Sequence, residues 1–144
     1  MEKTLHYLAM ALHLQFQKSL LANIKDTNLT SGQPKVLEYL LYHDEVVQKQ
    51  IAAACYIEPA TITSLLLGME KNGLIYRKNR NNNRRSLYVS ITDKGIDLAK
   101  RIRSEFESID ENALTGFSDK EKETLIDLLT RINNNMKGSN TRNE

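Results

Sequence analysis

A fifteen-residue segment bounded by Pro59 and Gly73 constrains the fold more than any other part of the chain. Proline is favoured in the first turn of a helix and glycine just past its end, so the segment predicts a helix. Its apolar residues recur at helical spacing and predict one buried face: Ile62, Leu65, Leu66 and Met69. The opposite face carries short side chains near its start: Ala60, Thr61, Thr63 and Ser64. We therefore expect a helix that can approach a polar partner closely.

A second helix and a hairpin flank this segment. The preceding helix is expected to turn Ile51, Ala52 and Cys55 inward, and its alanines permit close packing. The predicted elements are a helix over 48–55, a turn over 56–58, strands over 74–76 and 86–91, and a short stretch at 45–47 that could add a third strand. The predicted fold class is mainly α with a small β-wing, a winged helix-turn-helix domain with a helical dimerisation region from both termini.

Positive charge is concentrated in the hairpin. Residues 71–92 contain six basic residues and no acidic one, whereas the whole chain has a formal charge of only +2. A basic patch beside a small polar helix face is typical of proteins that bind nucleic acid. We expect the helix to enter a major groove and the wing to contact phosphate. The candidate DNA-binding residues are Thr61, Thr63, Ser64, Arg77, Lys78, Arg80, Arg84 and Arg85.

Composition excludes several other classes. The 144 residues suit one domain, or one domain with a dimerisation extension. The single cysteine, Cys55, excludes an internal disulfide and suits a reducing compartment. No apolar run approaches the roughly 18 residues of a membrane span, and the polar start is unlike a signal peptide. We therefore expect a cytoplasmic protein that does not partner with a membrane.

The ends of the chain predict further amphipathic helices. Three of these helices are predicted over about 1–24, 92–113 and 118–137. A further, short helix is entered at Pro34 and capped by Thr30 or Ser31. The helix over 118–137 should bury Leu125, Leu128, Leu129, Ile132 and Met136, after a capping box from Ser118 to Glu121. A core built from the middle of the chain could not cover all these apolar stripes, so we infer a two-fold homodimer. The predicted organisation is a dimerisation helix at 1–28, a DNA-binding domain at 29–92, dimerisation helices at 93–137 and a flexible tail at 138–144.

At this point the chain resembles the MarR family of bacterial winged-helix transcription regulators. The segments that carry the resemblance are Leu29-Thr30 with Gln33, 48–52, 59–63, 69–75, Asn83-Arg84-Arg85, and 87–95 with its Thr92-Asp93-Lys94-Gly95. The resemblance implies a homodimer, usually a repressor, that binds a palindromic site in double-stranded DNA near its own or a neighbouring promoter. It matches Thr61 and Thr63 to polar DNA-facing positions, and Arg84 or Arg85 to a wing arginine that reaches the minor groove.

The chain also departs from this family pattern. The family often has an acidic residue at the position of Asn83, a basic one at Ser64 and a serine at Ala60. Base preference is therefore not carried over from relatives. Many members release DNA when a small aromatic or phenolic compound binds, and His13, Phe16 and Tyr39 are candidates to line such an effector cavity.

Other chemistries find less support. Cys55 could be a redox sensor, but it follows three alanines on a face expected to be buried, which favours a core residue. The three histidines, His6, His13 and His43, lack supporting ligands at a metal-binding spacing, so we expect no metal and no cofactor. The sequence contains no recognisable phosphate-binding loop or nucleophile motif, so we expect that the protein is not an enzyme.

Two rival functions stay open at this stage. One is an architectural DNA binder that does not respond to an effector. The other is a winged-helix module whose basic wing binds an acidic protein.

Overall fold

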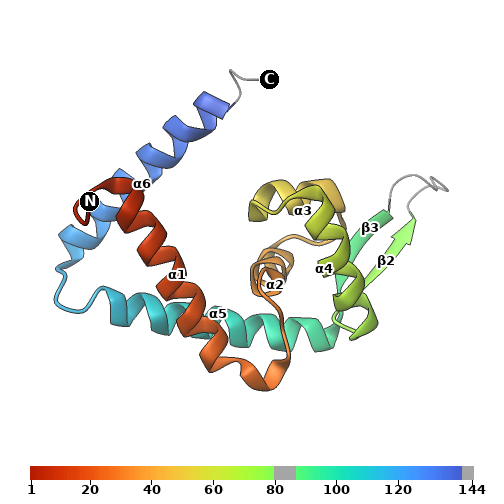
Figure 1. The fold of residues 1–144 in the computed structure, drawn as a ribbon. Coiled ribbons are helices and arrows are strands. Elements are labelled where there is room, and N and C mark those ends of the chain that lie inside the picture. Colours follow the sequence, from red (N-terminus) through yellow and green to blue (C-terminus); the bar gives the residue numbers. More distant parts are fainter. Residues whose placement is uncertain (80–86, 141–144) are drawn as a thin grey trace. The chain divides into compact units, whose positions relative to one another are not determined.

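The computed structural model describes residues 1–79 and 87–140 as a mainly helical chain with one three-stranded antiparallel sheet (Figure 1). The elements are α1 Leu5–Asn23, η1 Lys25–Thr27, α2 Gln33–Tyr42, β1 Val46–Val47, α3 Gln48–Cys55, α4 Pro59–Lys71, β2 Ile75–Asn79, β3 Leu87–Ile91, α5 Asp93–Ala113 and α6 Asp119–Asn140. The predicted mainly helical fold class with a β-wing is confirmed. Among these elements no single helix is long and apolar enough to span a membrane, although α3 and α4, bent by 111°, meet those criteria as a pair.

The chain divides into two compact units, residues 1–109 and 110–144. The first unit contains α1 to α4, the sheet and most of α5, and the second contains the end of α5 and all of α6. Buried side chains in the first unit come from each α-helix from α1 to α5 and from all three strands. The largest of them include Leu37, Leu40, Ile51, Ile62, Leu66, Met69 and Ile102. The predicted domain boundaries at residues 28 and 92 remain predictions.

The sheet has the strand order β1-β3-β2. Val46 of β1 pairs with Val89 of β3, which confirms the short third strand. On its other edge, β3 pairs Ile91 with Ile75 of β2. Ile75 and Val89 are buried in the core of the first unit, so the hairpin is anchored at its base. This anchoring fixes the direction in which the wing leaves the domain.

The turn between α3 and α4 explains how the two helices meet. Tyr56 has a left-handed backbone (φ 55°), and its N–H is bonded to the carbonyls of Ala52 and Ala53. The next N–H, of Ile57, donates to Ala52 O at 2.9 Å. These bonds satisfy carbonyls left free at the end of α3. Pro59 then starts α4, as the sequence predicts.

A compact junction joins the end of α4 to the start of α5. Thr92 Oγ1 donates to Gly73 O at 2.7 Å and accepts from Gly95 N at 3.0 Å, so the predicted threonine cap is confirmed. Lys94 Nζ donates to Asn72 O at 2.8 Å. These three bonds satisfy backbone groups at the ends of both helices. The junction holds α4 in a defined position on α5.

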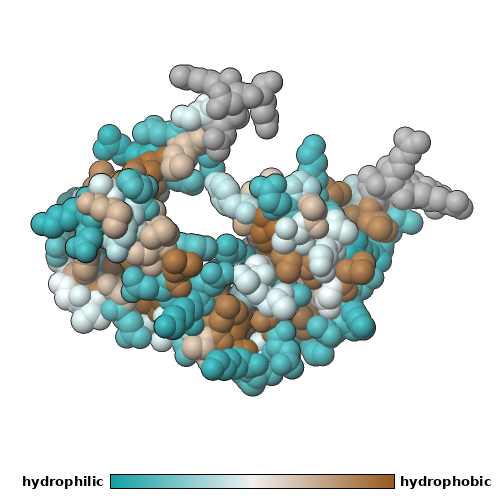
Figure 2. Space-filling model, viewed as in Figure 1, coloured by the Kyte–Doolittle hydropathy of each residue, from teal (hydrophilic) through white to brown (hydrophobic). Residues whose placement is uncertain are grey.

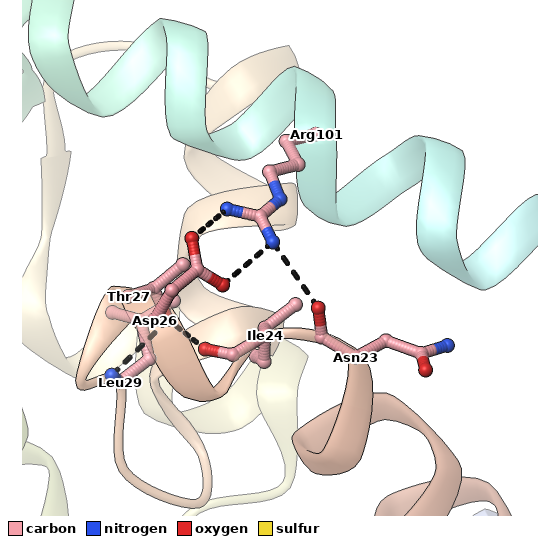
Figure 3. A network of polar contacts seen from close by, with 6 residues as sticks. All are labelled: Asn23, Ile24, Asp26, Thr27, Leu29 and Arg101. Atoms are coloured by element: carbon pink, nitrogen blue, oxygen red, sulfur yellow. Dashed lines mark hydrogen bonds and ion pairs between the residues drawn. The ribbon is translucent and has the colours of Figure 1, made fainter.

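Arg101 of α5 joins that helix to the connection between α1 and α2 (Figure 3). Its guanidinium binds Asp26 through two hydrogen bonds, from Nη1 to Oδ2 at 2.7 Å and from Nη2 to Oδ1 at 2.8 Å. Nη2 also donates to Asn23 O at 3.1 Å. The paired fork geometry suits arginine and cannot be reproduced by lysine. Hydrogen bonding from Arg101 holds the pKa of the Asp26 carboxyl below its usual range.

This pKa shift predicts how the contribution of Asp26 to stability depends on pH. A carboxyl whose pKa is lowered by folding stabilises the folded state above its unfolded pKa, which is about 3.9 for aspartate. The stabilisation is lost as pH falls through the lower, folded pKa. Replacing Asp26 with asparagine should therefore reduce stability at pH 7, and the difference from wild type should shrink below about pH 4. Urea unfolding of both proteins from pH 7 to pH 3 measures this; a constant difference would contradict it.

The start of α2 differs from the prediction. Its N-cap is Gly32, and neither Thr30 nor Ser31 caps the helix through its side chain. Instead, buried Gln33 accepts a hydrogen bond from Thr30 N at 3.0 Å and donates to Leu65 O of α4 at 3.4 Å. Ser31 Oγ accepts from Gln17. The long side chain of Gln33 can reach the preceding turn and α4 together, which a short capping side chain cannot.

The terminal helices differ from the prediction in length and in burial. α1 begins at Leu5 rather than Met1, and α6 continues to Asn140 rather than ending at Lys137. The capping box is confirmed: Ser118 N donates to Glu121 Oε1 at 3.0 Å, and Glu121 N donates to Ser118 Oγ at 3.1 Å. The predicted burial on α6 is not found within one chain, where the following side chains are exposed: Leu128, Leu129 and Met136.

Candidate nucleic-acid interface

The outer face of α4 brings the predicted helix residues together. Ile62, Leu66 and Met69 are buried, which turns the opposite side of the helix to solvent. Thr61 and Ser64 are exposed there, three residues apart and therefore neighbours on the helix surface. Other exposed side chains of α4 include Ala60, Thr63, Leu67 and Lys71. Sequence interpretation missed Leu67, although its position three residues after Ser64 places it on the same face.

Thr63 has a structural partner as well as an exposed position. Its Oγ1 accepts a hydrogen bond from Gln48 Nε2 of α3 at 2.6 Å and donates to Pro59 O at 3.2 Å. The hydroxyl therefore links the starts of α3 and α4. Gln48 was not among the predicted site residues, although it lies in segment 48–52, one of those that carry the family resemblance. Of the three predicted polar residues, Thr61 and Ser64 are the freer to contact a ligand.

In the described part of the wing, two basic residues form ion pairs that the count of charges in residues 71–92 overlooks. Arg77 Nε lies 3.2 Å from Glu70 Oε2, and the arginine side chain is only 15% exposed. Lys78 Nζ lies 2.6 Å from Glu45 Oε1, and the hydrogen bond to this carboxylate raises the pKa of Lys78. Both acidic residues lie before residue 71 and so outside the counted range. Contact of Arg77 and Lys78 with phosphate stays a prediction, and Arg80, Arg84 and Arg85 lie outside the described residues.

The candidate effector residues separate into two places. His13 and Phe16 of α1 line a pocket of about 80 Å³ together with Leu20, Pro34 and Phe106. Tyr39 lies elsewhere, in a shallow depression with Tyr42, Cys55 and Tyr56. There its ring stacks on His43, with ring centroids 4.2 Å apart. The expected meeting of His13, Phe16 and Tyr39 in one cavity is therefore not found, because Tyr39 is on a different side of α2.

Known proteins resemble this chain in sequence and in fold. Residues 29–87, which contain α2, β1, α3, α4 and β2 and end at the first residue of β3, match the model of the MarR family. The HTH-type transcriptional regulator YybA of Bacillus subtilis is 30% identical over 112 residues, which cover 78% of this chain and 75% of the relative. The chain belongs to the MarR family.

Two further comparisons bear on function. The homoprotocatechuate degradative operon repressor of Escherichia coli is 29% identical over 107 residues, covering 74% of this chain and 72% of the relative. A crystal structure described as a MarR-family transcriptional regulator from Listeria monocytogenes with 26mer DNA superposes with a TM-score of 0.90. It is 26% identical, and the match covers 95% of this chain and 91% of that one. The family and these relatives are transcriptional regulators and not enzymes.

Cys55 of this MarR-family chain is a core residue, as the sequence interpretation favoured. The side chain is buried, and its Sγ lies 3.7 Å from Lys35 O. Burial raises the pKa of the Cys55 thiol, which lowers the thiolate fraction at neutral pH. The described residues also contain no group of three His, Cys, Asp or Glu side chains placed to hold a metal ion.

The buried thiol predicts low reactivity. Because only the thiolate reacts with thiol reagents, Cys55 in the folded protein should react with Ellman's reagent at pH 8 at least about 100-fold more slowly than in 8 M urea. Stopped-flow absorbance measures both rates. Equal rates in the two conditions would contradict the burial of this side chain.

Proposed function

We propose that the chain is a sequence-specific regulator of transcription that binds double-stranded DNA as a homodimer. The observation that supports this most is the outer face of α4. Its short exposed side chains lie opposite a buried apolar face, and the helix is held at both ends. Thr63 joins its start to α3, and the bonds around Gly73 join its end to α5. A helix supported in this way is already ordered before it enters a major groove, so binding costs little conformational entropy.

Each candidate residue has a proposed role in this complex. Thr61, Thr63 and Ser64 face the base edges, and Arg77, Lys78 and Arg80 add positive charge near the backbone. Arg84 or Arg85 reaches phosphate or the minor groove. Because Arg77 and Lys78 already neutralise Glu70 and Glu45, we expect them to contribute less to the salt dependence of binding than unpaired cations would.

The proposed homodimer rests on apolar side chains that one chain leaves exposed. In α1, Leu5, Leu8 and Leu12 are 60%, 48% and 53% exposed. In α6, Leu128 and Leu129 are 47% and 48% exposed. So much exposed apolar surface is typical of an interface between chains. A two-fold dimer would set its two α4 helices about 34 Å apart, one turn of DNA, and would require a palindromic operator.

We propose that the protein is cytoplasmic. The dimer represses its own or a neighbouring promoter by occupying the promoter DNA. The Escherichia coli relative is named as a repressor, which supports repression over activation. A small aromatic or phenolic effector that binds beside His13 and Phe16 would release the DNA. The pocket there, of about 80 Å³, is smaller than the roughly 300–1,000 Å³ of most ligand sites. Effector binding would therefore require these two side chains to move.

The test is fluorescence anisotropy of the full chain on its own upstream region and on a scrambled duplex, at two salt concentrations. We expect preference for the upstream duplex and a steep loss of affinity as salt rises. Equal affinity for both duplexes would replace specific regulation with architectural binding. No binding to either at low salt would reject the DNA function and favour a protein partner. A panel of phenolic compounds and oxidants that leaves affinity unchanged would reject the effector.

A further inference from the structure

α4 lacks the side chains that read purines most specifically. Between Pro59 and Lys71 the helix contains no arginine, asparagine or glutamine. Arginine and lysine read guanine through paired hydrogen bonds, and asparagine and glutamine read adenine in the same way. Lys71 is the only basic residue of α4 and lies at its last position. Any selection of bases by the central and N-terminal parts of this helix must therefore use contacts other than these paired hydrogen bonds.

The outermost stripe of α4 is partly apolar. Ala60, Ser64, Leu67 and Lys71 follow one another at intervals of four, three and four residues, which places them on one line along the helix. All four are exposed, and Leu67 is 60% exposed although it belongs to a helix whose other leucines are buried or half-buried. In the space-filling view, brown apolar side chains lie among pale and teal ones over α3 and α4 (Figure 2). The face proposed to meet DNA is therefore not uniformly polar.

We propose that Leu67, with Ala60 on the same stripe, selects thymine by burying its C5-methyl group. Thymine is the only base of unmodified DNA that presents a methyl group in the major groove, and apolar contact is how proteins recognise it. Contact would remove both the methyl group and the exposed leucine from water. The inference rests on the proposed function and extends it: operator half-sites carry thymine where the middle of α4 faces the groove.

Replacing thymine with uracil removes this methyl group and leaves base pairing unchanged. The experiment uses the full chain and its upstream duplex, after footprinting has located the half-sites, and replaces the protected thymines one symmetric pair at a time. One buried methyl group is worth about fourfold in affinity, so a symmetric pair read by two Leu67 side chains should weaken binding about 15-fold. Uracil outside the footprint is the matched control and should leave affinity unchanged.

Two variants of Leu67 separate methyl contact from an effect of uracil on DNA shape. The comparison uses the pair of thymines whose replacement weakens wild-type binding most. There the Leu67→Ala protein should bind the thymine and uracil duplexes nearly equally, whereas Leu67→Met should still prefer thymine. Because Leu67 is exposed, neither substitution should disturb folding, which thermal melting checks. If wild type and Leu67→Ala lose the same factor on uracil, DNA shape is responsible and the inference is overturned.

The proposed function and this inference fail in different ways. Specific binding of the upstream duplex with equal affinity for its uracil version would overturn thymine selection by Leu67 and leave the regulator intact. Absence of binding to the unmodified upstream duplex would overturn the proposed function itself.

Discussion

Replacing Gly95 with alanine is expected to destabilise the folded chain by about 3 kcal/mol, near the upper end of the usual range for overpacking. A Cβ at this position would lie 2.2 Å from Leu74 O and 2.7 Å from Ile91 Cγ1. The isoleucine side chain could rotate away, but the carbonyl belongs to the backbone between α4 and β2. The helix propensity gained from alanine, about 1 kcal/mol, is too small to offset this overlap. Urea unfolding measures the loss.

Gly138 of α6 provides a matched control. It is also a helical glycine, but a Cβ added there would meet nothing within 4 Å. Alanine at Gly138 should leave stability unchanged or raise it by up to about 1 kcal/mol. If Gly95→Ala proved as harmless as Gly138→Ala, the close approach of α5 to the end of α4 would be wrong. Because the same contact positions α4, we also expect Gly95→Ala to weaken DNA binding.

Replacing Ser64 with glutamate is expected to weaken binding to the upstream duplex at least about 100-fold, because like charges brought together at an interface cost several kcal/mol. Ser64 lies in the middle of the exposed stripe of α4. The carboxylate of a glutamate at this position would meet the phosphates that line the groove. The side chain is exposed, so thermal stability should change little. Anisotropy at fixed salt measures the binding.

Ser104→Glu is the corresponding control for total charge. Ser104 is an exposed helical serine of α5, so the substitution adds the same charge away from α4. We expect affinity to change less than about twofold, since separated surface charges are largely screened by salt. Equal losses in the two variants would mean that net charge, rather than the position of Ser64, controls binding, and would contradict the proposed orientation of α4.

The helices, the turns and the hairpin were predictable from the sequence because their signals are local. Pro59 and Gly73 bound α4, and the buried positions Ile62, Leu66 and Met69 repeat at helical spacing. Thr92 and Ser118 are caps whose partners lie within three residues. The family was recognisable from the order of these local segments. Errors occurred at helix ends and where Gln33, rather than a neighbouring short side chain, bonds the turn before α2.

The candidate site was predictable only in part. Periodicity alone placed Thr61, Thr63 and Ser64 on the exposed face of α4. It also implied the exposure of Leu67, but an apolar side chain is not an obvious DNA contact. The bond from Gln48 to Thr63 and the separation of Tyr39 from His13 and Phe16 depend on how α2, α3 and α1 pack, which no local pattern encodes.

The sequence by itself determined the winged helix-turn-helix, the concentration of basic residues in the wing and the apolar stripes of the terminal helices. Only the tertiary structure decided which charges are paired. Lys78 meets Glu45 across the sheet, and Arg101 meets Asp26, 75 positions away in the chain. Local preferences arise from bonds and side-chain contacts within a few residues, so sequence encodes them directly. Pairing between distant residues arises only when the core of Leu37, Ile62 and their neighbours has brought the elements together.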